Sequence, residues 1–196
     1  GQVLLAERLP GRAEFGGLAT NLQQEVEEAG VRVVVGSRVD RALIEAERPD
    51  VVVIATGGLP RRPQIELLGD PVVLDAWEVL RGAALPEGRV VVADWRCDWV
   101  GSGVALFCAE QHRPVTLAVN GYMAGQEVQQ YVRHAFLAEL HRRRVDVVPL
   151  ARLYGADDDT VYFEHVTSGE PIIIEDVGCL VLAQGHTAND ALAAEL

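Results

Sequence analysis

Short, uninterrupted apolar runs alternate along this chain with stretches in which apolar residues recur every three or four positions. Residues 90–93 and 179–183 are apolar throughout, and residues 115–119 are apolar except for Thr116, which is typical of strands buried on both faces of a parallel sheet. Residues 104–111, between the first two of these runs, have the spacing of a helix. Strands that alternate with helices predict an α/β fold with a Rossmann-like, three-layer nucleotide-binding architecture.

The same patterns predict the remaining elements. Residues 13–29 carry Phe15, Leu18, Leu22 and Val26 on one helical face, and Gly30 follows as a helix-ending residue. Apolar runs at 31–35 and 51–55 predict two further strands. Helices are expected at 39–47, 75–81, 131–144 and 189–196, and strands at 145–149, 151–154, 160–165 and 172–174.

The unit at residues 89–120 reads strand, loop, helix, strand, which is the size of one nucleotide-binding βαβ half. In such a unit the loop normally has a G-x-G-x-x-G pattern, because backbone amides must approach a pyrophosphate closely. Here the loop places Asp94, Trp95, Arg96, Cys97, Asp98 and Trp99 before the first glycine, Gly101. The architecture of a nucleotide fold is therefore expected without its phosphate fingerprint.

This loop disfavours a nicotinamide cofactor. Asp94 and Asp98 would repel a pyrophosphate where a helix N-terminus should attract it. We expect Trp95 and Trp99 to fill the space that the amides need, with a cation–π contact to Arg96. Asn120 also stands where a ribose-binding acid would follow the second strand. Binding of NAD(P) is therefore not expected.

Composition excludes several classes of function. The 196 residues carry a formal charge of −12, which argues against nucleic acid as a partner. No apolar run is long enough to span a membrane, and no signal pattern is visible at the start. Three widely spaced cysteines fit a reducing cytoplasm, with Cys97 in a polar loop where it could be exposed.

We expect neither a catalytic centre nor a metal site within the chain. The five histidines are scattered, and no triad can be inferred from their separations. The acidic run at residues 157–159 lacks calcium-loop spacing and is interpreted as a solvated turn between two antiparallel strands.

Three segments together resemble a known family. Residues 1–6 with 10–15 are similar to the segment after the first two strands of a flavin-dinucleotide domain. Residues 51–58 with 60–63 resemble the "ATG" crossover of flavoproteins with two dinucleotide domains, and residues 176–190 resemble the closing strand of the flavin domain. Their order and spacing resemble the C-terminal half of the trimethylamine dehydrogenase and 2,4-dienoyl-CoA reductase family, the two-part relatives of old yellow enzyme.

The resemblance implies two domains. Residues 1–80 and 170–196 would form a partial FAD- or ADP-binding-like domain that lacks its first strand and G-x-G-x-x-G turn. Residues 88–165 would form an inserted NAD(P)-like domain with a degenerate fingerprint. We therefore expect the chain to be a fragment of a longer polypeptide, whose N-terminal barrel would carry FMN and a 4Fe–4S cluster.

The resemblance also implies where a cofactor would lie and what the parent protein does. The expected FAD- or ADP-binding residues lie at the chain start, at the crossover and around the closing strand. They are Gly1, Gln2, Ala55, Thr56, Gly57, Asp176 and Gly185.

Three functions stay open. The fragment could mainly scaffold the barrel or bind FAD or ADP in a dehydrogenase that oxidises or demethylates amines, itself without activity. It could instead belong to an NAD(P)H-dependent dienoyl-CoA reductase type of enzyme. Thirdly, it could be a non-catalytic module that docks an electron-transfer protein on its acidic face. The expected partners are the barrel of the same polypeptide and an electron-transfer protein.

Overall fold

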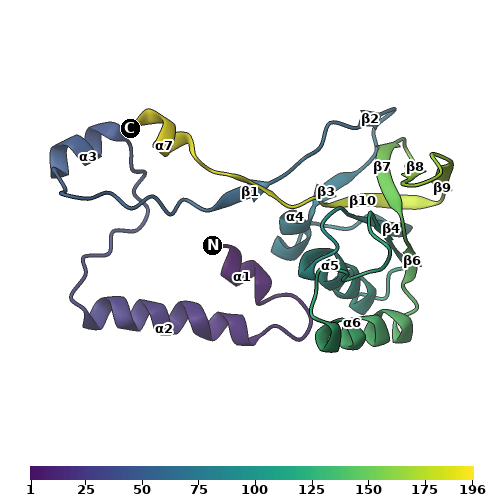
Figure 1. Ribbon diagram of the computed structural model, residues 1–196, viewed down its shortest axis with the longest axis horizontal. Coiled ribbons are helices and arrows are strands. Elements are labelled where there is room, and N and C mark those ends of the chain that lie inside the picture. The colour runs from purple at the N-terminus through teal and green to yellow at the C-terminus, as the bar shows by residue number, and fades with distance from the viewer.

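A parallel five-stranded sheet forms the centre of the protein, described here for residues 1–196 from a computed structural model (Figure 1). All neighbouring strands in it are parallel. The order is β3 (Val73–Asp75), β10 (Val177–Ala183), β4 (Arg89–Asp94), β5 (Val115–Val119) and β6 (Asp146–Val148). The expected α/β, Rossmann-like fold is confirmed.

Helices cover one face of this sheet. They are α4 (Ala76–Arg81), α5 (Trp99–Glu110) and α6 (Gln130–Arg142). Helix α4 begins with a capping box, in which the Asp75 carboxylate accepts the Trp77 and Glu78 amides while the Glu78 side chain accepts the Asp75 amide. This reciprocal pairing fixes the short helix at the end of strand β3.

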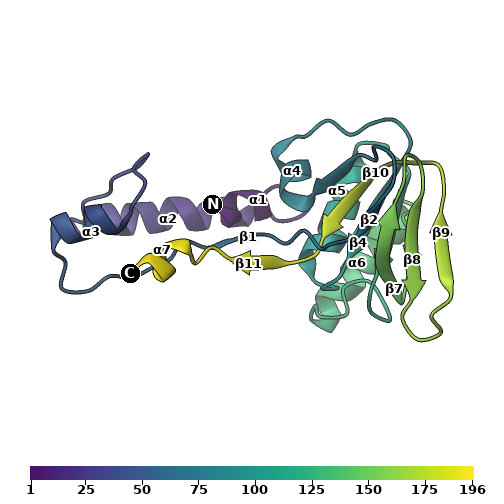
Figure 2. The same ribbon diagram turned by 90° about the horizontal axis from the view of Figure 1, so that it is seen from above.

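An antiparallel sheet covers the opposite face, as Figure 2 shows. Its order is β2 (Glu66–Leu67), β7 (Ala151–Ala156), β8 (Val161–His165) and β9 (Pro171–Ile174). Strands β7, β8 and β9 pair antiparallel, whereas the two-residue strand β2 lies parallel to β7. The third layer is therefore a sheet rather than a second set of helices.

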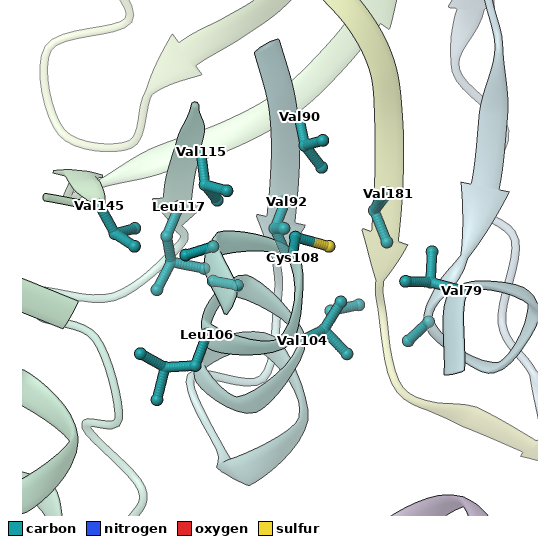
Figure 3. Packing of buried hydrophobic residues seen from close by; sticks show 14 of the residues in the cluster. Val79, Val90, Val92, Val104, Leu106, Cys108, Val115, Leu117, Val145 and Val181 are labelled. Carbon is teal, nitrogen blue, oxygen red and sulfur yellow. The ribbon is translucent and has the colours of Figure 1, made fainter. Parts of the chain in front are cut away.

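Two hydrophobic cores result, one on each side of the parallel sheet. Along β4, Val90 and Val92 point to the helices, while Val91 and Ala93 point to the antiparallel sheet. Figure 3 shows the first core, where Val104 and Cys108 of α5 lie against the strand side chains. The pattern of alternate residues on opposite faces explains why these strands are apolar throughout.

A separate arm extends from this body. It contains α2 (Glu14–Glu28), α3 (Arg41–Glu47) and α7 (Ala191–Glu195), which reach away from the sheets in Figure 1. Helix α1 (Gln2–Ala6) instead packs on the body, where Leu5 belongs to the core. A two-stranded antiparallel ribbon of β1 (Gly58–Pro60) and β11 (His186–Ala188) joins the arm to the body. This ribbon was not predicted from the sequence.

The two strands expected in the arm do not form. Residues 31–35 and 51–55 are extended but pair with no other strand, and Val35 and Val53 are 86% and 85% exposed. Helix α2 forms as predicted, yet it contains no buried residue. The prediction of strands was wrong because a strand needs a neighbour for its backbone, and this arm supplies none.

The position of strand β10 bears on the two implied domains. The resemblance implies that this strand, within residues 170–196, closes the FAD-like part. It lies between β3 and β4 in the central sheet, and β9 pairs with β8. The chain therefore leaves the body after residue 183, because the apolar run 179–183 is buried on both faces there.

No helix of the protein combines the length and the apolar character that crossing a membrane requires.

The division into body and arm makes a prediction about stability. Leu117 is fully buried in the core, whereas Leu22 on α2 is half exposed. Leu117→Ala should lower the free energy of unfolding by about 2–5 kcal/mol, because it leaves a cavity. Leu22→Ala, the matched control, should change it by less than about 0.5 kcal/mol. Urea unfolding followed by tryptophan fluorescence measures both, and similar losses for the two variants would contradict this division.

Candidate functional site

A cavity lined by both polar and apolar residues lies where the arm meets the body. It has a volume of about 640 Å³ and lies between α1, the crossover at residues 55–59 and α4. Five of the seven sequence-predicted site residues line it, namely Gly1, Gln2, Ala55, Thr56 and Gly57. Residues more than 50 positions apart in the chain are thus brought to one cavity.

The crossover in this wall is held by the returning chain. The Asn189 amide donates to the Gly57 carbonyl at 3.0 Å, and the Thr56 hydroxyl donates to the Asn189 carbonyl. Gly57 has a φ of +74°, a conformation that glycine adopts without strain. The Gln2 side-chain Nε2 donates to the Gly58 carbonyl at 3.5 Å, which connects α1 to the same wall.

Three further residues of this cavity were missed from the sequence. Trp77 and Arg81 lie one turn apart on α4, with the Arg81 guanidinium 5.3 Å from the Trp77 ring centroid, and Asn189 completes the wall. The Trp77 indole N–H donates to His186 Nε2 at 3.0 Å. Arg81 makes no ion pair, so its charge is available to an anion. The only sequence feature that could have indicated these residues is the four-residue spacing of Trp77 and Arg81, which places both on one face of a helix.

Asp176 and Gly185, the other two predicted residues, lie away from this cavity. They flank opposite ends of β10, and Asp176 pairs through its carbonyl with the Arg89 amide at the far end of the sheet. Gly185 accepts the Arg61 amide and lies against Arg96, in a small neighbouring space of about 20 Å³. The structure therefore does not bring Asp176 together with the other predicted residues.

The loop between β4 and α5 is occupied by the protein's own carboxylates. Asp94 Oδ1 accepts the amides of Arg96 at 3.1 Å and Cys97 at 2.8 Å, and Asp98 caps α5 by accepting the Val100 amide at 2.9 Å. A Cβ added at Gly101 would lie 2.2 Å from the Asp94 carboxyl carbon. The space and amides that a pyrophosphate would need are taken by Asp94 and Asp98, so NAD(P) does not fit this turn.

The tryptophans do not fill this position, contrary to our expectation. Trp95 is exposed beside Arg61, whose guanidinium carbon lies 5.7 Å from the ring centroid. Trp99 packs edge-on against Phe136, with Arg12 3.5 Å above its ring. Arg96 instead pairs with Asp98 at 3.5 Å. The arginines that contact Trp95 and Trp99 are distant in sequence. The sequence alone therefore indicated the neighbouring Arg96 as their cation–π partner.

Burial changes the acid–base properties of this loop. Removal from water raises the pKa of Asp94 to about 7, against the lowering effect of the Cys97 amide, and nearby Asp98 raises it further. Cys97 is buried rather than exposed, its Sγ accepts the Gly121 amide, and burial raises its pKa to about 11. Cys97 is therefore an unreactive thiol at neutral pH.

No group of histidine, cysteine and carboxylate side chains is arranged to bind a metal ion.

Comparison with known proteins shows similarity to oxidoreductases across the chain. No protein-family model matches it. It is 28% identical to an N,N-dimethylglycine/sarcosine dehydrogenase of Chromohalobacter salexigens, over 98% of this chain and 29% of that protein. It is 31% identical to a bilirubin reductase of Mediterraneibacter gnavus, over 96% of this chain and 29% of that protein.

Among solved structures, a histamine dehydrogenase from Rhizobium sp. 4-9 has a TM-score of 0.91 at 19% identity. The match covers the whole of this chain and 32% of that one. The fold, including the arm, is therefore shared. The present chain spans less than a third of the length of these similar proteins.

The buried Asp94 makes a prediction about pH. Its folded pKa lies near 7 and its unfolded pKa near 3.8, so only the folded protein holds the proton between these values. The free energy of unfolding should therefore fall as pH rises from 4 to 7, by up to about 1.4 kcal/mol per pH unit. Asp94→Asn should lack this contribution, so its stability relative to the unsubstituted protein should rise over that range.

Urea unfolding at pH 5, 6, 7 and 8 measures the difference between the two proteins. The exposed Asp50 supplies the matched control, Asp50→Asn, whose profile should parallel that of the unsubstituted protein. An Asp94→Asn profile that also stays parallel would show that burial does not raise the pKa.

Proposed function

We propose that this chain is the nucleotide-fold part of a flavin-dependent oxidoreductase that oxidises or demethylates an amine. The observation that supports this proposal most directly is the cavity at the crossover. It is lined by the predicted residues at the chain start and at the crossover, together with Trp77 and Arg81. Similarity to a dimethylglycine/sarcosine dehydrogenase along the whole chain supports the amine substrate class. The chain by itself is proposed to have no activity, and to act within a larger cytoplasmic protein.

FAD or ADP is the proposed ligand of the cavity. Its lining fits an adenine nucleotide in three ways. Gly57 allows a ligand to approach the backbone, Trp77 adds an aromatic wall, and Arg81, which lies over the Trp77 ring, is a cation without an ion-pair partner for a phosphate. A bound flavin would supply electron transfer, whereas ADP would have a structural role. Gly1, Gln2, Ala55, Thr56 and Gly57 would hold the nucleotide, while Asp176 and Gly185 are not proposed as ligands.

The remainder of the parent protein is proposed to contain a barrel with FMN and a 4Fe–4S cluster. The unpaired, exposed segments 31–35 and 51–55 support the view that other parts of that polypeptide complete the arm. Valine-rich extended segments with unpaired backbone groups are rarely left exposed to water. The barrel and an electron-transfer protein are the proposed partners.

The occupied β4–α5 turn favours a dehydrogenase over an NAD(P)H-dependent reductase. Asp94 already accepts the two amides that a pyrophosphate would need, and Asp98 adds a second negative charge. An enoyl reductase type of enzyme remains the second candidate, because the similarity to a bilirubin reductase is of the same extent. In that candidate the reductant would have to bind outside this turn.

The nucleotide cavity makes a prediction about affinity. In the full polypeptide stripped of bound nucleotide, Arg81→Gln should weaken ADP binding about tenfold, since a charged hydrogen bond to phosphate is lost. Arg41→Gln on α3, a residue that pairs with Glu45 away from the cavity, is the matched control and should leave the affinity unchanged. Isothermal titration measures both, and equal affinities for the two variants would exclude Arg81 as a phosphate ligand.

The occupied turn makes a prediction about electron donors. NADH should reduce the flavin of the full polypeptide slowly or not at all, whereas an N-methylated amine substrate should reduce it rapidly. Stopped-flow absorbance at the flavin band measures both rates. Rapid reduction by NADH would overturn the dehydrogenase proposal in favour of the reductase.

A further inference from the structure

The outer face of the antiparallel sheet is not covered by any other layer. It faces away from the parallel sheet and from the arm (Figure 2). A groove of about 420 Å³ crosses it, lined among others by Glu66 and Leu68, by Tyr154 and Tyr162, and by Glu164. The groove is distinct from the nucleotide cavity, with which it shares no residue.

A β-bulge explains why two tyrosines meet in this groove. Leu153 pairs with Phe163 and Gly155 pairs with Tyr162, so Tyr154 is the extra residue of strand β7. A bulge of this kind redirects a side chain, and Tyr154 is 54% exposed on the outer face next to Tyr162. Gly155 lets β2 approach closely, since a Cβ there would lie 2.5 Å from the Glu66 carbonyl oxygen.

The second tyrosine is held by a carboxylate. The Tyr162 hydroxyl donates to Asp157 Oδ2 at 2.6 Å, and Asp157 also accepts the Thr160 amide at 3.0 Å. This bond raises the pKa of Tyr162 and lowers that of Asp157, so the phenol stays neutral and the carboxylate stays charged. The ring of Tyr162 is thus fixed beside a permanent negative charge.

The surroundings are strongly acidic. Residues 64–72 and 150–176 contain nine carboxylates and a single arginine. These segments therefore contribute −8 to the formal charge of −12. That arginine, Arg152, pairs with Glu164 at 2.8 Å. Glu66, on the other side of the groove, has no cationic partner, and no arginine lines the groove.

We propose that this groove is a binding site for an organic cation, an ammonium or guanidinium group with an apolar flank. The faces of Tyr154 and Tyr162 attract the cation, Glu66 balances its charge, and Leu68 receives the apolar flank. The ligand is either a free amine or the arginine or lysine side chain of a protein partner, which have this chemistry in common. The inference is independent of the proposed redox function.

The test uses two pairs of probes, each with one cationic and one neutral member. Benzylammonium is compared with benzyl alcohol, and the peptide acetyl-Leu-Arg-Leu-amide with acetyl-Leu-Gln-Leu-amide. NMR of the tyrosine ring resonances should show saturable shifts at Tyr154 and Tyr162 for both cations, with a Kd of about 1 mM or below. Tighter binding of the peptide would indicate a protein side chain as the ligand, and tighter binding of benzylammonium a free amine.

Variants separate the site from general electrostatic attraction. Glu66→Gln should weaken cation binding about two- to fivefold, while Glu25→Gln on α2 removes the same charge elsewhere and should have no effect. Tyr154→Phe keeps the ring and should bind as before, whereas Tyr154→Leu should lose binding by a similar factor.

Two results would overturn the proposal. One is equal shifts for the charged and neutral probes, and the other is the absence of saturable shifts for both cations. Because the groove and the nucleotide cavity share no residue, ADP affinity should be unchanged in the Glu66 and Tyr154 variants. A failure of the cation site would therefore leave the proposed redox function standing, and the reverse also holds.

Discussion

Strand β4 must be buried on both faces, and most of the body follows from this requirement. Its residues 90–93 are exposed to solvent by 1% at most, so each face needs its own apolar layer. Helix α5 and its neighbours supply one layer, and the antiparallel sheet supplies the other. The central strands β4 and β10 cannot leave either face in water, because both of their faces are apolar.

The polar residue that ends this strand, Asp94, decides what the central unit can do. Asp94 is buried and turns back to accept two amides of its own loop. In a nucleotide-binding unit these donors would remain free for a phosphate. The loop therefore has its hydrogen bonds satisfied internally, at the cost of burying a carboxyl group whose second oxygen has no partner. The fold is retained while the usual ligand site is closed.

The arm shows the opposite situation. Its helices form, but its valine-rich segments remain exposed. The arm is joined to the body by the β1–β11 ribbon and by the segment around α1, whose Leu5 lies in the core of the body. The cavity with Trp77 and Arg81 lies at this junction, so both its walls depend on how the ribbon holds the arm. The groove with Tyr154 and Tyr162 lies on the other side of the central sheet. The two candidate binding regions thus belong to different layers.

Local pattern determined many of the helices and strands. The sequence predicts the apolar runs of β4, β5 and β10 and the helical spacing of α2, because each depends on residues close in sequence. The short body strands β2 and β3 were not predicted. The replacement of glycines by Asp94 and Asp98 likewise identified a closed phosphate turn. The meeting of Gly1 and Gln2 with residues 55–57 followed from a family resemblance rather than from periodicity.

Tertiary structure alone decided the remaining features. Residues 31–35 have the apolar pattern of a strand. A strand forms only where a neighbouring strand pairs with its backbone N–H and C=O groups, and the local pattern does not identify that neighbour. Three further features depend on contacts between distant segments. Strand β10 lies beside β4, Asp176 lies away from the cavity, and Trp99 packs against Arg12. The apolar pattern of the sequence predicts which residues are buried. Which residues they pack against depends on how the whole chain folds.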